Sequence, residues 1–241
     1  MFYQMFFMLI LCLNSFISIH ATLEESIQQS RKLIGDLTHH NIKVLSQYEL
    51  FASNIVNGAA NNKISSENFQ KIIKALDFAA HKHVNQTRKD ADKTPYIIHP
   101  MGVANNIIEI GEVYDTDILV AALLHDTVED TATSFEEIKQ HFGETIESLV
   151  REVTDDKSLP KEERKCLQIV NASHKSHSAT IVKLGDKLYN LTDLLHNPPS
   201  DWQKQRIDEY FTWAQQVINN LPEANSSLKH HVNQIIKTYH E

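Results

Sequence analysis

Turn-forming residues are scarce in this chain, and this scarcity limits the choice of folds more than any other feature of the sequence. Only six glycines and six prolines occur among 241 residues. A β-sandwich with many tight turns, or a glycine-rich nucleotide-binding fold, normally uses more of both. Apolar and polar residues do not alternate convincingly with period two, and the chain holds no internal repeat. The sequence therefore predicts an all-α fold.

Helix-start signals agree with this fold class. A serine-capped helix is predicted from Ser65 to Ala79, because its apolar residues recur every three or four positions. A capping-box pattern predicts a second helix that starts at Ser134 and ends at Gly143. A third helix start is predicted at Ser200, directly after two prolines.

The N-terminal part of the chain differs in character from the rest. Residues 1–21 contain no Asp, Glu, Lys or Arg, and they hold an apolar stretch typical of a signal-peptide core. A secretory signal cleaved after Ala21 is predicted, with an uncleaved membrane anchor as the alternative. Residues 22–65 are predicted to form an N-terminal helical extension that ends in a Gly/Asn-rich patch. Residues 66–241 then form the main domain.

Charge and cysteine content exclude several kinds of protein. Lys and Arg total 23 and Asp and Glu total 31, so the formal net charge is −8. This balance argues against a partner that is a nucleic acid. Cys12 and Cys166 cannot form a disulfide framework or a cysteine-based zinc site. The 14 histidines, in contrast, favour a metal site, because histidine is the commonest metal ligand.

The segment of residues 123–130 carries the densest signal for chemistry. It places His125, Asp126, Glu129 and Asp130 directly after an apolar run. If the segment is one helix, His125 and Glu129 share a face, and so do Asp126 and Asp130. A solvated acidic helix end is the alternative interpretation of this segment taken alone.

Two further segments each offer a possible metal ligand. His99 precedes Pro100, and on its own it is more typical of a turn or core histidine. Asp186 lies among apolar residues, with Asn190 four positions later on the same helical face. A buried carboxylate needs a partner, and a bound cation would be one.

Together these segments supply two imidazoles and two carboxylates, from His99, His125, Asp126 and Asp186. This mixed set of nitrogen and oxygen ligands suits a divalent ion such as Mn²⁺ or Fe²⁺, and zinc remains possible. Four protein ligands leave open positions for water and a substrate oxygen. The predicted cofactor is therefore one divalent metal ion, with Mn²⁺ the preferred candidate.

Three segments carry a resemblance to a known family. The pattern of a first histidine, an adjacent His-Asp pair and a later aspartate is similar to that of the HD-domain phosphohydrolases. More specifically, the chain resembles the alarmone hydrolase domain of the RelA/SpoT group in its small, stand-alone metazoan SpoT-like form. The resemblance covers roughly residues 66–235 and implies an HD-domain helical bundle. The segments that carry it are Thr94–Pro100, Ala121–Thr131 and Val182–Leu191.

The resemblance assigns roles to particular residues. It places the metal ligands on the four residues already named and a catalytic acidic pair on Glu129 and Asp130, which would orient and deprotonate the attacking water. Arg88 and Lys89 match a basic pair that would hold phosphate oxygens or support the catalytic acids. Without the resemblance, these two residues would be interpreted as a solvated charge cluster.

Other matches concern the nucleotide. Asn190 matches a residue that contacts the ribose or base, while Lys161, Arg206 and Tyr210 are expected to line the phosphate and base end of the substrate. Arg206 and Tyr210 stand one helical turn apart, so they can face one pocket or form a structural pair.

The implied reaction is hydrolysis of the 3′-diphosphate of guanosine 3′,5′-bis(diphosphate), which releases GDP and pyrophosphate. One alternative is removal of the 2′-phosphate of NADPH or of a phosphate from a related nucleotide. Another is a non-catalytic secreted protein that binds nucleotides, although a pure binder has no need of Glu129 and Asp130. The oligomeric state is left open.

The chain departs from the family pattern at two positions. Gly185 replaces an alanine before the ligand Asp186, and His81 replaces a commonly basic arginine. Four N-glycosylation patterns also occur, and the one at Asn225 is the one best placed for an exposed turn, so it is expected to carry a glycan. Asn190 is expected to stay unmodified because its helix faces the metal pocket.

Overall fold

The computed structural model describes residues 21–241, and the predicted signal peptide lies almost entirely outside the described residues. The predicted all-α fold is confirmed. Regular structure in the described range is helical, apart from an isolated bridge between Thr87 and Pro95. None of the helices in that range has the length and apolar character that a membrane span requires.

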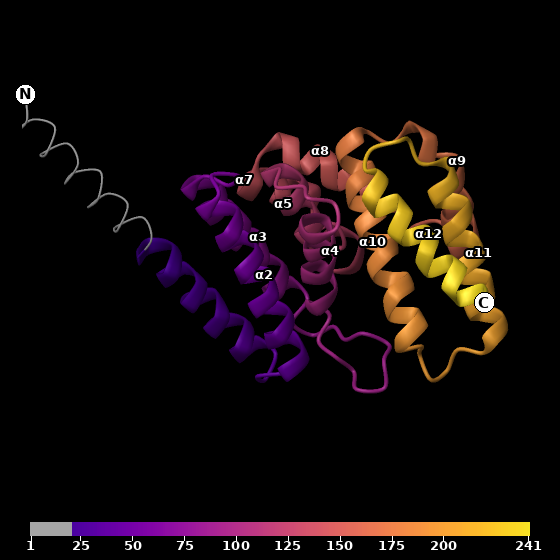
Figure 1. Cartoon of the computed structure of the whole chain (residues 1–241), viewed down its shortest axis with the longest axis horizontal. Coiled ribbons are helices and arrows are strands. Elements are labelled where there is room, and N and C mark those ends of the chain that lie inside the picture. The colour runs from indigo at the N-terminus through magenta and orange to yellow at the C-terminus, as the bar shows by residue number, and fades with distance from the viewer. Residues whose placement is uncertain (1–20) are drawn as a thin grey trace, which may run out of the picture.

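Two N-terminal helices form an antiparallel pair at one end of the molecule (Figure 1). Residues 21–37 are helical, and α2 spans Ile42–Ala60. The Tyr48 hydroxyl donates a hydrogen bond of 2.7 Å to the Ile27 carbonyl and so links the two helices. Tyr48 and Phe51 are fully buried, and α2 packs against α4, so this N-terminal helical pair shares the hydrophobic core.

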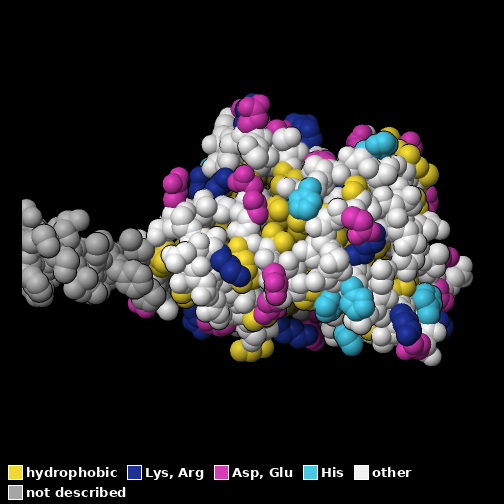
Figure 2. All heavy atoms as spheres, turned by 45° about the horizontal axis from the view of Figure 1, so that its top comes forward, with side chains coloured by type: hydrophobic (Ala, Val, Ile, Leu, Met, Phe, Trp, Pro, Cys, Tyr) yellow, Lys and Arg dark blue, Asp and Glu magenta, His cyan; other side chains and the backbone are white. Residues whose placement is uncertain are grey.

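The remaining helices build one bundle around α10, which contacts α4, α5, α8, α11 and α12. Helix α5 is buried over most of its length, because Ile118 to Leu124 are all apolar. On the face shown in Figure 2, acidic and basic side chains are interspersed over the surface. The helices are α3 (Ser66–Lys82), α4 (Ile98–Glu109), α5 (Thr116–Leu124), α6 (Thr127–Asp130), α7 (Phe135–Phe142), α8 (Glu144–Val153), α9 (Lys161–Val170), α10 (His177–His196), α11 (Lys204–Asn220) and α12 (Ser226–His240).

Two of the three predicted helix starts are confirmed. The Ser65 hydroxyl accepts from the Asn68 amide at 3.2 Å, and Ser134 likewise caps α7. Gly143 ends α7 with a φ of 91°, a conformation that favours glycine. The start predicted at Ser200 is wrong. Ser200 lies in a turn closed by a hydrogen bond from the Trp202 amide to the Pro199 carbonyl, and α11 begins only at Lys204.

The expected exposure of Asn225 is also wrong. Its side chain caps α12 by accepting from the Leu228 amide at 3.0 Å and donates to the Gly111 carbonyl at 2.8 Å. Both polar atoms are therefore engaged in a half-buried position. Asn85, in contrast, lies exposed in the turn after α3.

Gly185 permits a close approach between α10 and α4. A Cβ atom at this position would stand 2.8 Å from Cγ1 of Ile107 and 3.3 Å from Cγ1 of Val103. The alanine of the family pattern would therefore be overpacked here. His81 is exposed on α3, and its ring bonds the Asp77 carbonyl of its own helix.

Candidate metal centre and active site

The chain departs from a continuous helix at the centre of the site. Helix α5 ends at Leu124 and α6 begins at Thr127, so the single helix expected over this segment is interrupted at His125 and Asp126. The His125 Nδ1 atom bonds the Ala122 carbonyl at 2.8 Å, which leaves Nε2 free to face the site. The interruption turns two consecutive side chains toward one point, which an unbroken helix would not do.

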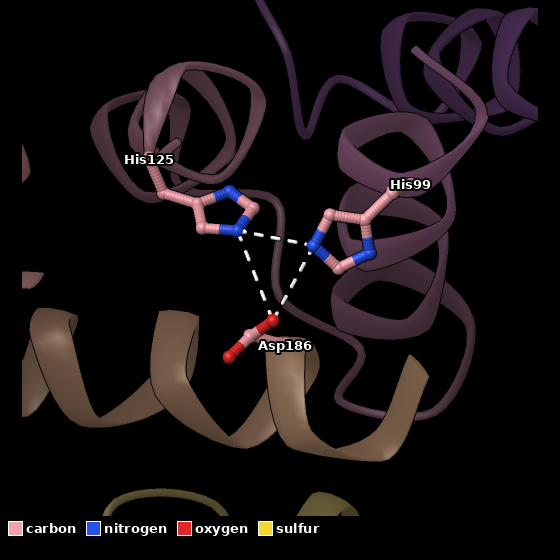
Figure 3. Close-up of side chains that lie close together, drawn as sticks. All are labelled: His99, His125 and Asp186. Carbon is pink, nitrogen blue, oxygen red and sulfur yellow. Dashed lines mark hydrogen bonds and ion pairs between the residues drawn. The ribbon is translucent and has the colours of Figure 1, made fainter. Parts of the chain in front are cut away.

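Three donor atoms from three helices meet at this point (Figure 3). His99 comes from the first turn of α4, His125 follows α5, and Asp186 comes from the middle of α10. The two Nε2 atoms of the histidines lie 3.3 Å apart. Oδ1 of Asp186 lies 3.4 Å from the His99 nitrogen and 3.8 Å from that of His125. All three residues are buried.

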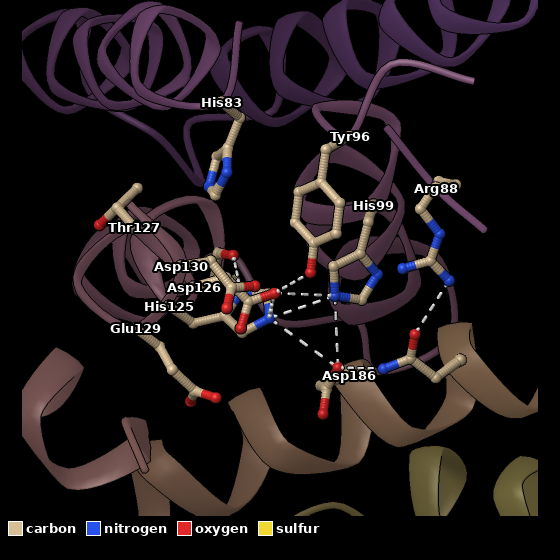
Figure 4. Close-up of polar contacts among 12 residues, drawn as sticks. His83, Arg88, Tyr96, His99, His125, Asp126, Thr127, Glu129, Asp130 and Asp186 are labelled. Carbon is tan, nitrogen blue, oxygen red and sulfur yellow. Dashed lines mark hydrogen bonds and ion pairs between the residues drawn. The ribbon is translucent and has the colours of Figure 1, made fainter. Parts of the chain in front are cut away.

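Asp126 adds a fourth donor to the group (Figure 4). Its Oδ2 atom lies 3.0 Å from His125 Nε2 and 3.3 Å from His99 Nε2. The Tyr96 hydroxyl donates to the same oxygen at 2.6 Å. Burial alone would raise the pKa of Asp126, but the facing histidines outweigh it and hold this pKa well below its ordinary value.

The spacing of these donors fits one divalent cation. Ligand atoms about 2.1 Å from a shared ion stand about 3.0 to 3.4 Å apart in octahedral or tetrahedral geometry. Four of the five separations given above, from 3.0 to 3.4 Å, match this range, and the fifth, 3.8 Å between His125 and Asp186, is slightly longer. The structure thus brings the four residues predicted as ligands together, and His99, His125 and Asp186 among them form a group that could hold a metal ion.

Two neighbours hold the Asp186 carboxylate in place. The Lys187 ammonium lies 3.0 Å from Oδ2, and the Asn190 amide donates to Oδ1 at 2.6 Å. Burial lowers the pKa of Lys187, and the contact with Asp186 more than compensates, so the net shift is upward. Lys187 was not predicted from the sequence. Its signal was a lysine directly beside a predicted buried carboxylate.

The predicted acidic pair lies beside this centre. Glu129 Oε2 accepts from the Asp155 amide at 3.0 Å, while Oε1 lies 3.5 Å from Arg164 and 3.6 Å from Lys157. The same Lys157 ammonium pairs with Asp130. Burial, followed by the neighbouring carboxylates, raises the pKa of Glu129 above its ordinary value. A carboxylate shifted in this direction is a stronger base, as general-base chemistry requires.

A cavity of about 410 Å³ opens onto the metal centre and the acidic pair. Of the predicted substrate residues, Arg88, Lys89, Asn190 and Tyr210 line it, whereas Lys161 and Arg206 do not. Arg206 stacks over the Trp202 ring with its guanidinium carbon 4.1 Å from the ring centroid.

The two predicted residues outside the cavity lining still share one charged neighbourhood. Burial, together with the positive charges of Lys165 and Arg206, lowers the pKa of Lys161. Lys89 contributes in the same direction, so cations from three parts of the chain gather beside the cavity.

Arg88 is already partnered within the chain. Its guanidinium donates to Asn190 Oδ1 at 3.1 Å and to Asp193 Oδ2 at 2.7 Å. Lys89 is exposed and makes no ion pair with any residue that the structure describes. Asp193 was missed by the sequence analysis, because only the fold brings it beside Arg88.

The chain is similar to known proteins over the part that holds these residues. The HD domain family matches residues 75–212, a range that includes every predicted site residue. Guanosine-3′,5′-bis(diphosphate) 3′-pyrophosphohydrolase MESH1 of Xenopus tropicalis is 56% identical over 158 residues, which cover 66% of this chain and 88% of that protein. The protein of the same name in Homo sapiens is 50% identical over 167 residues, with 69% of this chain and 93% of that protein covered.

A solved structure is similar as well. It is described as a metazoan ortholog of SpoT that hydrolyses ppGpp and plays a role in starvation responses. Its TM-score with this chain is 0.69 at 46% sequence identity, with 70% of this chain and 95% of that chain covered.

Proposed function

Since the chain belongs to the HD domain family, we propose that it hydrolyses the 3′-diphosphate of guanosine 3′,5′-bis(diphosphate) to GDP and pyrophosphate. The observation that carries this proposal is a buried cluster of two imidazoles and two carboxylates that borders, together with a separate acidic pair, one cavity. Its relatives at 50% identity or more bear the name of this activity.

We propose that His99, His125, Asp126 and Asp186 hold one divalent metal ion. The mixed nitrogen and oxygen donors support Mn²⁺, with Fe²⁺ or Zn²⁺ as alternatives. The ion supplies Lewis-acid stabilisation of the charge that develops on phosphoryl oxygens. Lys187 and Tyr96 orient the carboxylates of this set through contacts of 3.0 Å to Asp186 and 2.6 Å to Asp126.

Glu129 acts as the general base in this proposal. Its raised pKa favours acceptance of a proton from the attacking water, whose oxygen bonds to the phosphorus attached to the ribose 3′-oxygen. The bond from phosphorus to the 3′-oxygen breaks, pyrophosphate departs, and the 3′-oxygen of GDP takes up a proton. Lys157 contacts both Glu129 and Asp130 and thereby fixes their relative position.

The substrate would lie along the cation-rich side of the cavity. Arg88 and Lys89 would bind phosphate oxygens, and Asn190 would contact the ribose or base. Tyr210 lines the cavity wall, and Lys161 and Arg206 add positive charge outside it. An anionic nucleotide would therefore be attracted to this side, although the chain as a whole is acidic.

A side-by-side assay tests the proposal. Metal-supplemented protein is incubated with guanosine 3′,5′-bis(diphosphate) or with NADPH, and pyrophosphate and orthophosphate are followed separately. We expect pyrophosphate from the first substrate at the higher kcat/KM. Orthophosphate from NADPH as the faster reaction would favour the phosphomonoesterase alternative, and binding without turnover of either would favour the non-catalytic one.

We further propose that the protein enters the secretory pathway. The uncharged segment of residues 1–21 supports a cleaved signal, and an uncleaved anchor is the alternative. The exposed sequon at Asn85 is compatible with a luminal environment.

A further inference from the structure

The basic pair Arg88 and Lys89 lies on a small loop between α3 and α4, which projects from the bundle in Figure 1. Two backbone hydrogen bonds close its base into a hairpin of residues 86–96. The Arg88 amide donates to the Thr94 carbonyl at 2.7 Å, and the Tyr96 amide donates to the Gln86 carbonyl at 2.9 Å. We call this segment the phosphate hairpin.

The tip of the phosphate hairpin is held by carboxylates. Asp90 accepts from the Thr94 amide at 2.9 Å and from the Thr94 hydroxyl at 2.6 Å. Asp92, at the tip, lies 2.6 Å from the ammonium of Lys43, and Asp90 lies 3.9 Å from it. Lys43 belongs to the first turn of α2, far from the hairpin in sequence and outside the family match at residues 75–212.

The helix that carries Lys43 is firmly anchored. Tyr48 and Phe51 of α2 are fully buried, and α2 packs along α4. The Asn54 amide donates to Asn105 of α4 at 3.0 Å. Helix α4 follows the phosphate hairpin directly and carries His99. The N-terminal helical pair therefore contacts the hairpin tip and, through α4, the scaffold of the metal centre.

The charges around Lys43 affect how an anionic substrate would bind. Asp92 and Asp90 lie 2.6 and 3.9 Å from the Lys43 ammonium and raise its pKa, and the more distant Asp193 acts in the same direction. Asp193 is also the partner of Arg88. Without the ammonium, these carboxylates would repel phosphate groups close to the residues that are to bind them.

We propose that Lys43 is a positioning residue, which acts through Asp90 and Asp92 to hold the phosphate hairpin so that Arg88 and Lys89 face the phosphates of the substrate. The N-terminal helical pair thereby contributes to substrate affinity without contacting the substrate. This inference rests on the proposed function for the identity of the substrate.

Kinetics of Lys43→Met test the proposal, because methionine keeps most of the aliphatic stem and removes the charge. An exposed ion pair supports an effect of at most about fivefold. We expect KM for guanosine 3′,5′-bis(diphosphate) to rise about threefold to fivefold, kcat to change less than twofold, and the difference to shrink at high salt. Lys43→Arg should restore KM.

Lys71→Met is the matched control. Lys71 pairs with Asp117 at 2.8 Å between α3 and α5, with comparable partial exposure, and neither residue lines the cavity. This variant should keep the parental KM. An equal rise in KM for both lysine variants would overturn the proposal, because it would indicate a general charge effect.

Hydrogen exchange without substrate provides a second measurement, which does not depend on activity. Amides of residues 88–94 should exchange faster in Lys43→Met than in the parent or in Lys71→Met. Unchanged exchange, or faster exchange with an unchanged KM, would overturn the positioning role. If the protein fails to hydrolyse guanosine 3′,5′-bis(diphosphate), the affinity for inorganic pyrophosphate, measured by calorimetry, replaces KM as the readout.

Discussion

Glu129 and the proposed metal ligands have different partners, and this difference supports the separate roles proposed for them. Two histidines face Asp126, whereas Glu129 contacts a backbone amide and the cations Lys157 and Arg164. Its carboxylate is therefore available as a base while it remains fixed in position.

Glu129→Gln should remove the base while the side chain keeps its position. A glutamine oxygen can still accept from the Asp155 amide, which Glu129 Oε2 now does at 3.0 Å, so fold and metal content should be kept. Loss of the base should lower kcat by about 10²-fold or more. The pKa of Glu129 is raised, so in the parent kcat/KM should fall as the pH drops through a value above the ordinary glutamate pKa of about 4.3. If the variant keeps the parental rate and the same decline of kcat/KM at low pH, Glu129 is not the general base.

Asp186→Asn tests the ligand set. The change removes the negative charge that faces His99 and His125 and leaves the buried Lys187 ammonium without its ion pair. We expect loss of bound metal, loss of turnover and a lower melting temperature. Asp193→Asn, on the same helix but outside the ligand set, should retain the metal. Metal analysis of both purified variants decides the point, and a full metal content in Asp186→Asn would refute the assignment.

At the scale of single residues, the sequence was enough to propose the four candidate ligands, which the structure brings together, but not the residues that hold them in place. His99, His125, Asp126 and Asp186 stand beside apolar runs, so their burial and chemical type could be inferred. Several of the residues that contact the site residues are far from them in the sequence, so these contacts could not be predicted from spacing. Tyr96, Lys157 and Asp193 reach Asp126, Asp130 and Arg88 only through the packing of separate helices and loops.

Among the elements, the interruption between α5 and α6 explains why local periodicity was misleading. The pattern of residues 123–130 fits a continuous helix, whereas the structure interrupts the helix at His125 and Asp126. The Thr127 hydroxyl donates to the Leu124 carbonyl at 2.7 Å across this interruption. The start of α11 was mispredicted for a similar reason, since Ser200 and Trp202 form a turn before the helix.

The contact between α10 and α4 gives a prediction about Gly185→Ala. Helix propensity alone would stabilise the protein by up to about 1 kcal/mol. The added methyl group would meet Ile107 at 2.8 Å, and overpacking costs about 1–3 kcal/mol, so we expect a net loss in the free energy of unfolding. In an Ile107→Ala background the same change should be stabilising. Denaturant unfolding of the four proteins checks this, and stabilisation in both backgrounds would contradict the overpacking account.

For the whole molecule, the N-terminal helical pair extends the core beyond the residues matched by the family. Its helices could be predicted from apolar spacing. Its contact with the phosphate hairpin could not, because Lys43 and Asp92 are ordinary surface charges in the sequence.

Secretion gives a prediction at the same scale. In a eukaryotic host the mature protein should begin at or near Thr22 and appear in the medium, with glycan at Asn85 and none at Asn190 or Asn225. Asn85 is exposed, whereas the amide nitrogens of the other two donate to Asp186 and Gly111. Mass spectrometry with and without a glycosidase checks each site. A soluble intracellular product with Met1 intact would refute the signal peptide.

The most direct test of the central claim is the product stoichiometry of metal-stripped and metal-restored protein acting on guanosine 3′,5′-bis(diphosphate). Protein with Mn²⁺ restored should release one pyrophosphate for each GDP formed. The stripped protein should release none, and neither should Asp186→Asn with Mn²⁺ added. Release of orthophosphate in place of pyrophosphate, or equal rates with and without the metal, would contradict a metal-dependent 3′-pyrophosphohydrolase centred on His99, His125, Asp126 and Asp186.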